Sequence, residues 1–219
     1  MLTPLQVRVA EIVKDLPESA GFALAGGGAL VVQGVINRTT RDLDYFTTPE
    51  EAETLIGLRD ALKTALEQAG LDYVIIRDLP TFVRLEVQGD QDRCEVDLAV
   101  DYRALPPERS ELGPTLAVKE LAANKVLAVF DRAEARDFRD LAALVDQFPL
   151  DELMRLATDK DPGFDKTGFI EALNAFDRLD PEEFDLDIDD YRRLRTLVST
   201  WRQQLERHLG RDDPGLSLG

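Results

Sequence analysis

Three consecutive glycines near the N-terminus, Gly26 to Gly28, separate two short apolar segments and restrict this part of the chain to a strand–turn–helix unit. Gly21–Ala25 has the length and composition of a buried strand, and Ala29–Gln33 is typical of a short helix that ends near Gly34. Glycine lacks a Cβ atom, so the turn between them can bend sharply and its N–H groups remain accessible to a phosphate group. The pattern therefore predicts a phosphate-binding turn.

Two aspartates follow on the next predicted strand. Asp42 and Asp44 lie in Asp42–Phe46, which alternates polar and apolar residues. Side chains at i and i+2 of a strand share a face, with Cα atoms about 7 Å apart. Two carboxylates at this spacing repel each other unless a cation lies between them. Mg²⁺, or Mn²⁺, suits such oxygen ligands, and Mg²⁺ usually binds one or two carboxylates together with substrate phosphates. The turn and the aspartate pair together predict a phosphate-and-metal site.

The wider pattern is a mixed half followed by a helical half. A Pro- and Gly-rich stretch from Leu105 to Pro114 is the predicted linker. Before it we expect two further helices and three further strands: Pro4–Leu16, Pro49–Ala69, Tyr73–Arg77, Thr81–Gln88 and Arg93–Val100, with a hairpin turn at Gly89-Asp90. After it we expect only helices: Leu116–Phe130, Ala135–Phe148, Asp151–Thr158, Thr167–Phe176 and Asp189–Leu209. The prediction is an α+β fold with domains at residues 1–105 and 106–219, the second a helical bundle.

Composition excludes several classes of protein. The single cysteine, Cys94, excludes an intrachain disulfide and a cysteine zinc cage, and it is expected to be a small buried apolar residue. The single histidine, His208, argues against a poly-histidine metal site and a serine–histidine hydrolase. A net charge of -17 argues against indiscriminate nucleic-acid binding but permits a local basic groove. No apolar run approaches the roughly 20 residues of a membrane span, and Met1–Lys14 lacks a signal-peptide pattern. A cytoplasmic protein with no membrane partner is expected.

The order of these motifs resembles a known superfamily. Gly26-Gly27 followed by Asp42-x-Asp44 looks like the signature of the polymerase β-like nucleotidyltransferases. The fuller pattern, GGxAL and then R-x-T-x-DLD-[YF]-F, resembles the AbiEii/MenT branch of toxin nucleotidyltransferases. Two later motifs, Glu120–Lys125 and Arg136–Leu141 ("RD-x-x-DL"), are similar to helices of that branch, so the resemblance covers about residues 22–145. Many members carry Gly-Ser where this chain has Gly26-Gly27, so backbone amides would have to hold the triphosphate.

The resemblance implies a polymerase β-like mixed sheet and a helical domain that completes the active-site cleft. It also implies roles for individual residues. Asp42 and Asp44 would hold Mg²⁺, Lys125 would bind the nucleotide phosphates, and Asp137 would be a further essential carboxylate. The alternative for Lys125 is an exposed helix lysine. The alternative for Asp137 is a surface ion pair with a neighbouring arginine, such as Arg136 or Arg139.

A third metal carboxylate is expected on a neighbouring strand. Alternation over Arg93–Val100 places Asp97 in mid-strand on the polar side, so Asp97 is the candidate; the alternative is a solvent-facing carboxylate at a sheet edge. Arg38 and Arg41 flank the loop before the aspartate pair. They would contact the triphosphate or an RNA phosphate, with Arg38 the nucleotide-binding candidate, or else balance the charge of the aspartates.

The function that the resemblance implies is transfer of a nucleoside monophosphate from NTP to the 3′ end of tRNA, with release of pyrophosphate. Such an enzyme would be the toxin of a toxin–antitoxin pair, with a cognate antitoxin as partner. The same chemistry on a small cationic acceptor, such as an aminoglycoside, or on a protein hydroxyl is an alternative, and the acidic charge suits a cationic acceptor. A catalytically inactive interaction module is a second alternative, against which the retained Asp42 and Asp44 argue.

A local basic stretch lies in the last predicted helix, between Arg192 and Arg211. It would meet the phosphate backbone of tRNA. The alternative is that these arginines pair with the acidic segment Asp177–Asp190.

Overall fold

The computed structural model describes residues 1–89 and 92–212, and the chain divides into two compact units, Met1–Leu121 and Ala122–Gly219. In the described part of the first unit, seven strands form one mixed sheet in the order β3-β4-β5-β2-β1-β7-β6. The strands are β1 Ala23–Ala25, β2 Asp42–Thr47, β3 Asp72–Leu79, β4 Phe82–Gln88, β5 Arg93–Val100, β6 Glu108–Ser110 and β7 Gly113–Thr115. The helices of this unit are α1 Pro4–Asp15, α2 Gly26–Val32 and α3 Thr54–Gln68.

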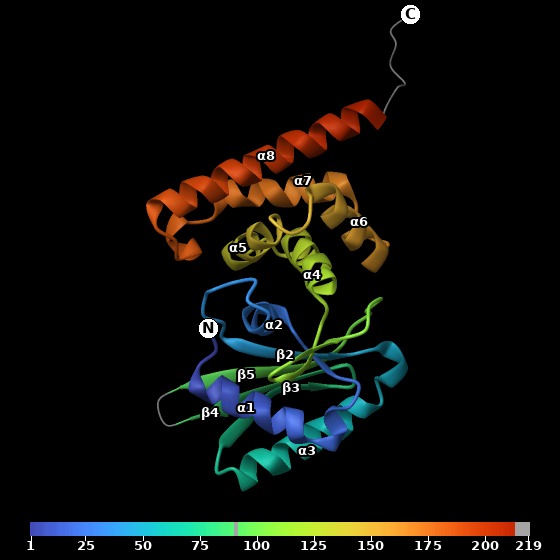
Figure 1. The fold of residues 1–219 in the computed structure, drawn as a ribbon, viewed down its shortest axis with the longest axis vertical. Coiled ribbons are helices and arrows are strands. Elements are labelled where there is room, and N and C mark those ends of the chain that lie inside the picture. The colour runs from blue at the N-terminus through green and yellow to red at the C-terminus, as the bar shows by residue number, and fades with distance from the viewer. Residues whose placement is uncertain (90–91, 213–219) are drawn as a thin grey trace, which may run out of the picture. The chain divides into compact units, whose positions relative to one another are not determined.

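The two faces of the sheet differ because residues alternate along its central strands. One face is apolar and buried, and α1 and α3 cover it (Figure 1). Its central residues are Leu43 and Tyr45 on β2, Val83 and Leu85 on β4, and Val96 and Leu98 on β5. The opposite face carries Asp42 and Asp44, as the alternation predicts.

A capping box at the start of α1 also helps to position the loop before β2. The Thr3 side chain accepts a hydrogen bond from the Gln6 N–H, and the Gln6 side chain accepts one from the Thr3 N–H. The buried Gln6 side chain then donates to the carbonyl of Thr40, 3.0 Å away.

Helix α3 begins later than the sequence suggests. Pro49–Glu51 forms a separate 3₁₀ turn, and α3 starts at Thr54.

The segment expected to be a linker is part of the sheet. β6 and β7 form an antiparallel hairpin, and β7 pairs with β1 through Leu24 and Thr115. The first compact unit therefore continues to Leu121, and the expected boundary at residue 105 does not coincide with the division between the units. Prolines and glycines are common in linkers, so the local composition by itself favours a linker here. The pairing with β1 is a long-range contact that this local composition does not reveal.

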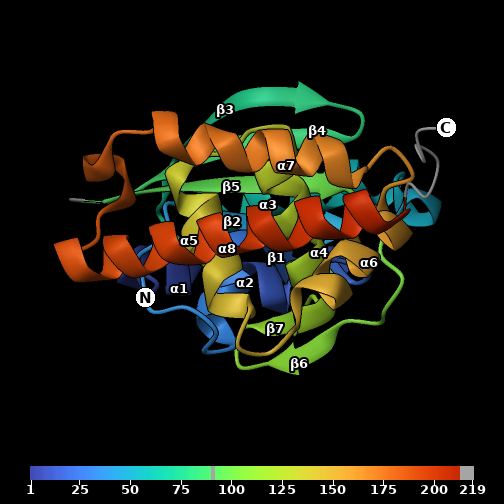
Figure 2. The same cartoon turned by 90° about the horizontal axis from the view of Figure 1, so that it is seen from above.

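The second unit is helical, as expected. Its helices are α4 Val118–Asp131, which begins in the first unit, α5 Ala135–Leu144, α6 Leu150–Lys160, α7 Lys166–Asn174 and α8 Ile188–Asp212. Helices α7 and α8 run alongside each other (Figures 1 and 2). The largest side chains of its core are aromatic: Phe138, Phe169, Phe176, Phe184 and Trp201 are buried. None of the described helices combines the length and the apolar character that a membrane crossing requires.

Candidate active site

The glycine turn lies directly against the second aspartate. Ala25, the last residue of β1, pairs with Asp44 on β2. Gly26 follows with φ of +58°, in the left-handed region that side-chain-bearing residues avoid. A Cβ atom at Gly26 would lie 1.8 Å from Oδ2 of Asp44. Both the backbone conformation and the space beside Asp44 therefore require glycine here.

The second glycine faces the loop that precedes β2. A Cβ atom at Gly27 would lie 2.9 Å from Oγ1 of Thr40 and 3.2 Å from a guanidinium nitrogen of Arg38. Thr40 is buried, and its hydroxyl donates a hydrogen bond of 2.7 Å to Oδ1 of Asp42. The structure thus brings Gly27, Arg38 and Asp42 together around Thr40. Thr40 was missed as a site residue, although it is the threonine of the R-x-T-x-DLD pattern, two residues before Asp42.

Asp97 lies beside Asp44, on the neighbouring strand. Strands β2 and β5 are parallel and pair Asp44 with Asp97 and Asp42 with Glu95. The Asp97 carboxylate is buried and accepts two hydrogen bonds from Arg84, of 2.7 and 2.6 Å. These bonds raise the pKa of the Arg84 guanidinium. Arg84 was also missed; its signal is a polar position in the alternating segment Thr81–Gln88.

The carboxylates present fit a metal that completes its shell with substrate oxygens. Among the described residues, no three His, Cys, Asp or Glu side chains are grouped closely enough to hold a metal ion by themselves. Asp42 and Asp44 supply two carboxylates on one face of β2, beside a turn without side chains. Mg²⁺ usually takes one or two protein carboxylates together with phosphate oxygens and water. The residues suit that kind of site and not a closed metal cage.

The second unit contains an ionic cluster in which the exposed Arg132 contacts three buried residues, Lys125, Asp137 and Asp140, directly or through one another. The Lys125 ammonium lies 2.8 Å from a carboxylate oxygen of Asp140 and 3.9 Å from one of Asp137. Asp137 accepts two hydrogen bonds from Arg132, of 2.7 and 2.8 Å. Lys125 is 7% exposed, and both aspartates are fully buried. Lys125 is therefore not an exposed helix lysine, and Asp137 is not a surface residue.

The sequence analysis did not identify two members of this ionic cluster. Asp140 is the second aspartate of the "RD-x-x-DL" motif, which was its available signal. Arg132 directly follows α4 and shows no pattern that would have distinguished it from other arginines.

A polar pocket of about 340 Å³ lies at the beginning of β2 and β5. Arg41 lines it, so the arginine that follows Thr40 faces a cavity. The other lining residues are Thr3, Gln6, Thr39, Thr40, Glu86, Asp92, Arg93 and Glu95. Both acidic and basic side chains line this pocket, so its charge does not select one kind of ligand.

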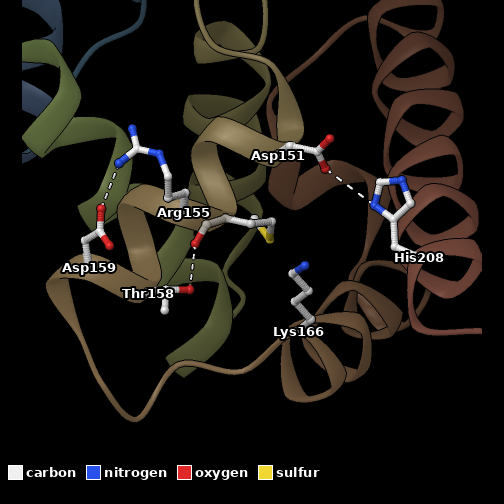
Figure 3. A pocket seen from close by; sticks show the side chains of 7 residues that line it. Asp151, Arg155, Thr158, Asp159, Lys166 and His208 are labelled. Carbon is white, nitrogen blue, oxygen red and sulfur yellow. Dashed lines mark hydrogen bonds and ion pairs between the residues drawn. The ribbon is translucent and has the colours of Figure 1, made fainter. Parts of the chain in front are cut away.

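A larger pocket, of about 560 Å³, lies within the helical unit (Figure 3). Two pairs of side chains lie in its lining: His208 is 3.5 Å from Asp151, and Arg155 is 2.8 Å from Asp159. Met154, Thr158 and Lys166 complete the described lining, which includes none of the predicted site residues.

The basic stretch of α8 is largely ion-paired. Arg192 pairs with Asp189 at 3.3 Å, and Arg193 pairs with Asp190 at 2.7 Å. Arg202 lies 2.8 Å from Asp177. For these arginines the alternative prediction, pairing with Asp177–Asp190, is confirmed; the Arg211 side chain lies outside the described part.

Comparison with known proteins identifies the family. The family model for the nucleotidyl transferase AbiEii toxin of type IV toxin–antitoxin systems matches residues 11–218. No curated protein matches the chain. The structure of JHP933 from Helicobacter pylori is similar, with a TM-score of 0.56 and 20% identity over 97% of each chain. A second H. pylori structure, of a protein described as a nucleotidyltransferase, has a TM-score of 0.56 and 22% identity over 93% of this chain and 95% of that one. These likenesses show a shared fold. Because the family model spans nearly the whole sequence, this chain belongs to the AbiEii nucleotidyl transferase toxin family and is a nucleotidyltransferase of a toxin–antitoxin system.

Proposed function

We propose that this enzyme transfers a nucleoside monophosphate from an NTP to the 3′ end of tRNA in a reaction that depends on Mg²⁺ or Mn²⁺. One observation carries the proposal: because Gly26 has no side chain, the Asp44 carboxylate lies directly against the glycine turn, while Thr40 orients Asp42 on the same strand face. Phosphate oxygens and carboxylates repel each other, so a triphosphate approaching this turn needs a cation there. This combination supports metal-dependent nucleotide binding.

The metal would be held by Asp42 and Asp44. When bound, the ion supplies positive charge that neutralises phosphate oxygens during phosphoryl transfer. The glycine turn offers the backbone N–H groups of Gly26 and Gly27, and Arg38 next to Gly27 offers a guanidinium for the triphosphate. In the transfer, the acceptor hydroxyl oxygen bonds to the α-phosphorus and loses its proton to solvent. The bond from the α-phosphorus to the bridging oxygen breaks, and pyrophosphate leaves.

The ionic cluster of the helical unit serves the same reaction in this proposal. Lys125 would bind the nucleotide phosphates, as the family resemblance implies, with Asp137 as a second essential residue. The contact with Asp140 holds the Lys125 ammonium in one position. Phosphoryl transfer depends mainly on positioning and charge neutralisation, so a fixed ammonium suits this role better than a mobile one.

The biological context follows from the family, and the acceptor is part of the proposal. As the toxin of a type IV toxin–antitoxin system, the protein has a cognate antitoxin and uses an NTP. We propose tRNA as the acceptor, which places the reaction in the cytoplasm. Nucleotide addition to the tRNA 3′ end would block aminoacylation.

The direct test is incubation with each α-³²P-labelled NTP, total tRNA and Mg²⁺, followed by gel separation. We expect label on tRNA with at least one NTP and no label after chelation of the metal. Asp42→Asn and Asp44→Asn should abolish labelling. The control Asp72→Asn, at an exposed position of β3, should label tRNA like the wild type. Labelling of a small cationic acceptor without tRNA would disprove the tRNA proposal. Absence of any transfer would disprove the enzymatic proposal.

A further inference from the structure

The open face of the sheet has a regular arrangement of side chains between Asp44 and the edge strand β3. Cross-strand pairing places Asp44, Asp97, Arg84 and Arg77 in one row across β2, β5, β4 and β3. Side chains paired across neighbouring strands share a face. The row therefore leads from the proposed metal-binding carboxylates to two arginines at the far edge.

An apolar row runs beside it. Phe46, Ala99, Phe82 and Leu79 are paired in the same order from β2 to β3. All four lie two positions along their strands from the first row, so they share its face. Phe46 and Phe82 are both half-buried, which leaves part of each ring accessible. The face thus offers one aromatic ring on the strand of the carboxylates, β2, and another on β4, next to the edge strand.

Two cations lie close to the Phe82 ring. The guanidinium carbons of Arg77 and Arg84 each lie 5.7 Å from the centre of its ring, within the range of cation–π attraction. Arg84 also binds Asp97. Arg77 is exposed and has no ion-pair partner among the residues that the structure describes. An aromatic ring beside an available guanidinium can stack a nucleobase and bind its phosphate.

Edge strand β3 adds exposed apolar surface. Val74, Ile76 and Leu79 are 48%, 58% and 43% exposed. Pairing with Glu86 and Phe82 places Val74 and Leu79 on the same open face. Clustered exposed apolar residues of this kind mark binding surfaces more often than isolated ones.

We propose that Arg77, Leu79, Phe82 and Arg84, here called the acceptor platform, bind the single-stranded 3′ segment of the RNA that the enzyme modifies. This inference rests on the proposed function, which requires a 3′ hydroxyl near Asp42 and Asp44. Strand β4 lies two strands from β2, or about 10 Å away. Stacked nucleotides advance by about 3.4 Å each. A base on Phe82 would therefore lie roughly three nucleotides from the reacting end.

The partly exposed aromatic ring favours a nucleic acid as the partner at this place, because nucleobases stack on such rings. Base stacking on an aromatic ring is tolerant of sequence and needs few cations, so it can operate in a chain with a net charge of -17. Three arginines of α8, by contrast, pair with aspartates: Arg192, Arg193 and Arg202. The acceptor platform combines stacking surface with Arg77, which forms no ion pair within the described ranges, whereas the α8 stretch offers paired arginines.

The test is fluorescence anisotropy with 5′-labelled oligouridylates of two, four and six nucleotides at several salt concentrations. Wild-type affinity should rise clearly between two and four nucleotides. Phe82→Ala should bind the four-nucleotide RNA about 5- to 100-fold more weakly, whereas Phe82→Trp should retain binding. Arg77→Ala should reduce the slope of log affinity against log salt by about 0.7, the contribution of one single-strand phosphate contact.

Two control variants show whether removal of any exposed apolar or basic side chain weakens RNA binding. Ile56→Ala removes an exposed apolar side chain from α3, on the opposite face, and Arg109→Ala removes an exposed arginine from the other edge strand, β6. Both should bind RNA like the wild type. Unchanged RNA affinity in Phe82→Ala, or a preference of the wild type for duplex RNA, would overturn the acceptor platform. If the acceptor platform fails this test but the enzyme still labels tRNA, the proposed function stays intact. If the wild type transfers no nucleotide from any NTP, the proposed function itself is refuted.

Discussion

The carboxylate of Asp44 occupies the space that a side chain at Gly26 would fill, since a Cβ atom there would lie 1.8 Å from Oδ2 of Asp44. Gly26 also has a positive φ of +58°. Two separate physical constraints, one conformational and one steric, therefore act at the same residue. They can be separated by comparison with Gly34, which has a φ of +70° but would have no described atom within 4 Å of an added Cβ atom.

Gly26→Ala should abolish nucleotide transfer, whereas Gly34→Ala should leave it nearly unchanged. Both variants should lose about 1 kcal/mol or more of unfolding free energy from left-handed backbone strain. Only Gly26→Ala displaces the Asp44 carboxylate. Urea unfolding and tRNA labelling measure the two effects. Equal losses of activity in both variants would show that the strain, and not the contact with Asp44, matters.

Thr40→Val should lower the transfer rate by roughly tenfold or more. The Thr40 hydroxyl donates to Asp42 at 2.7 Å, and a hydrogen bond to a charged group contributes about 1.5–3 kcal/mol. Valine keeps the shape of the side chain but cannot orient the carboxylate. Thr40→Ser retains the hydroxyl and should keep most of the rate. If valine and serine behave alike in a steady-state assay, the hydrogen bond has no role in transfer.

Asp97→Asn distinguishes a structural partner of Arg84 from a third metal ligand. If the pair with Arg84 is its main role, the variant should lose about 1–3 kcal/mol of stability and keep measurable transfer. Asp44→Asn should show the reverse, with little loss of stability and no transfer. Thermal unfolding and labelling should be measured on both. Loss of transfer in Asp97→Asn at unchanged stability would instead make Asp97 a metal ligand.

Lys125→Met should be destabilised by about 3–5 kcal/mol, because the buried Asp137 and Asp140 carboxylates would lose the ammonium that they share. The double variant Lys125→Met with Asp140→Asn leaves Arg132 and Asp137 as a balanced pair. It should recover much of the stability. If Lys125 binds the nucleotide phosphates, the double variant should still fail to bind NTP in calorimetry. Recovery of NTP binding together with stability would assign Lys125 a purely structural role.

Cys94 should resist alkylation in the native protein. Burial, with smaller contributions from nearby carboxylates such as Asp42, raises the pKa of its thiol to about 12. Because only the thiolate reacts, near pH 8 about one molecule in ten thousand is reactive, and this fraction grows as the pH rises toward the pKa. Iodoacetamide should label the protein only after urea unfolding, as mass spectrometry would show. Complete labelling of the native protein near pH 8 would mean that β5 is not covered as the structure indicates.

The features that local pattern determines were predictable from the sequence. The alternation at Asp42–Phe46 correctly places both aspartates on one face, and the glycine turn lies at the start of α2. The helices after residue 116 follow the apolar periodicity of the chain. The same periodicity predicted the α+β class, which the mixed sheet confirms. These properties depend on residues within a few positions of one another, so a single sequence contains the necessary information.

The partners of the charged side chains were decided only by the tertiary structure. Neighbours along the chain suggested Arg136 or Arg139 for Asp137, yet the structure pairs it with Arg132. Asp97 meets Arg84 because β4 and β5 pair in one particular register. The Pro- and Gly-rich stretch after residue 105 joins the sheet because β7 pairs with β1, far away in sequence. Which side chains and strands pair depends on which set of long-range contacts gives the lowest total free energy. Local composition and periodicity do not carry that information.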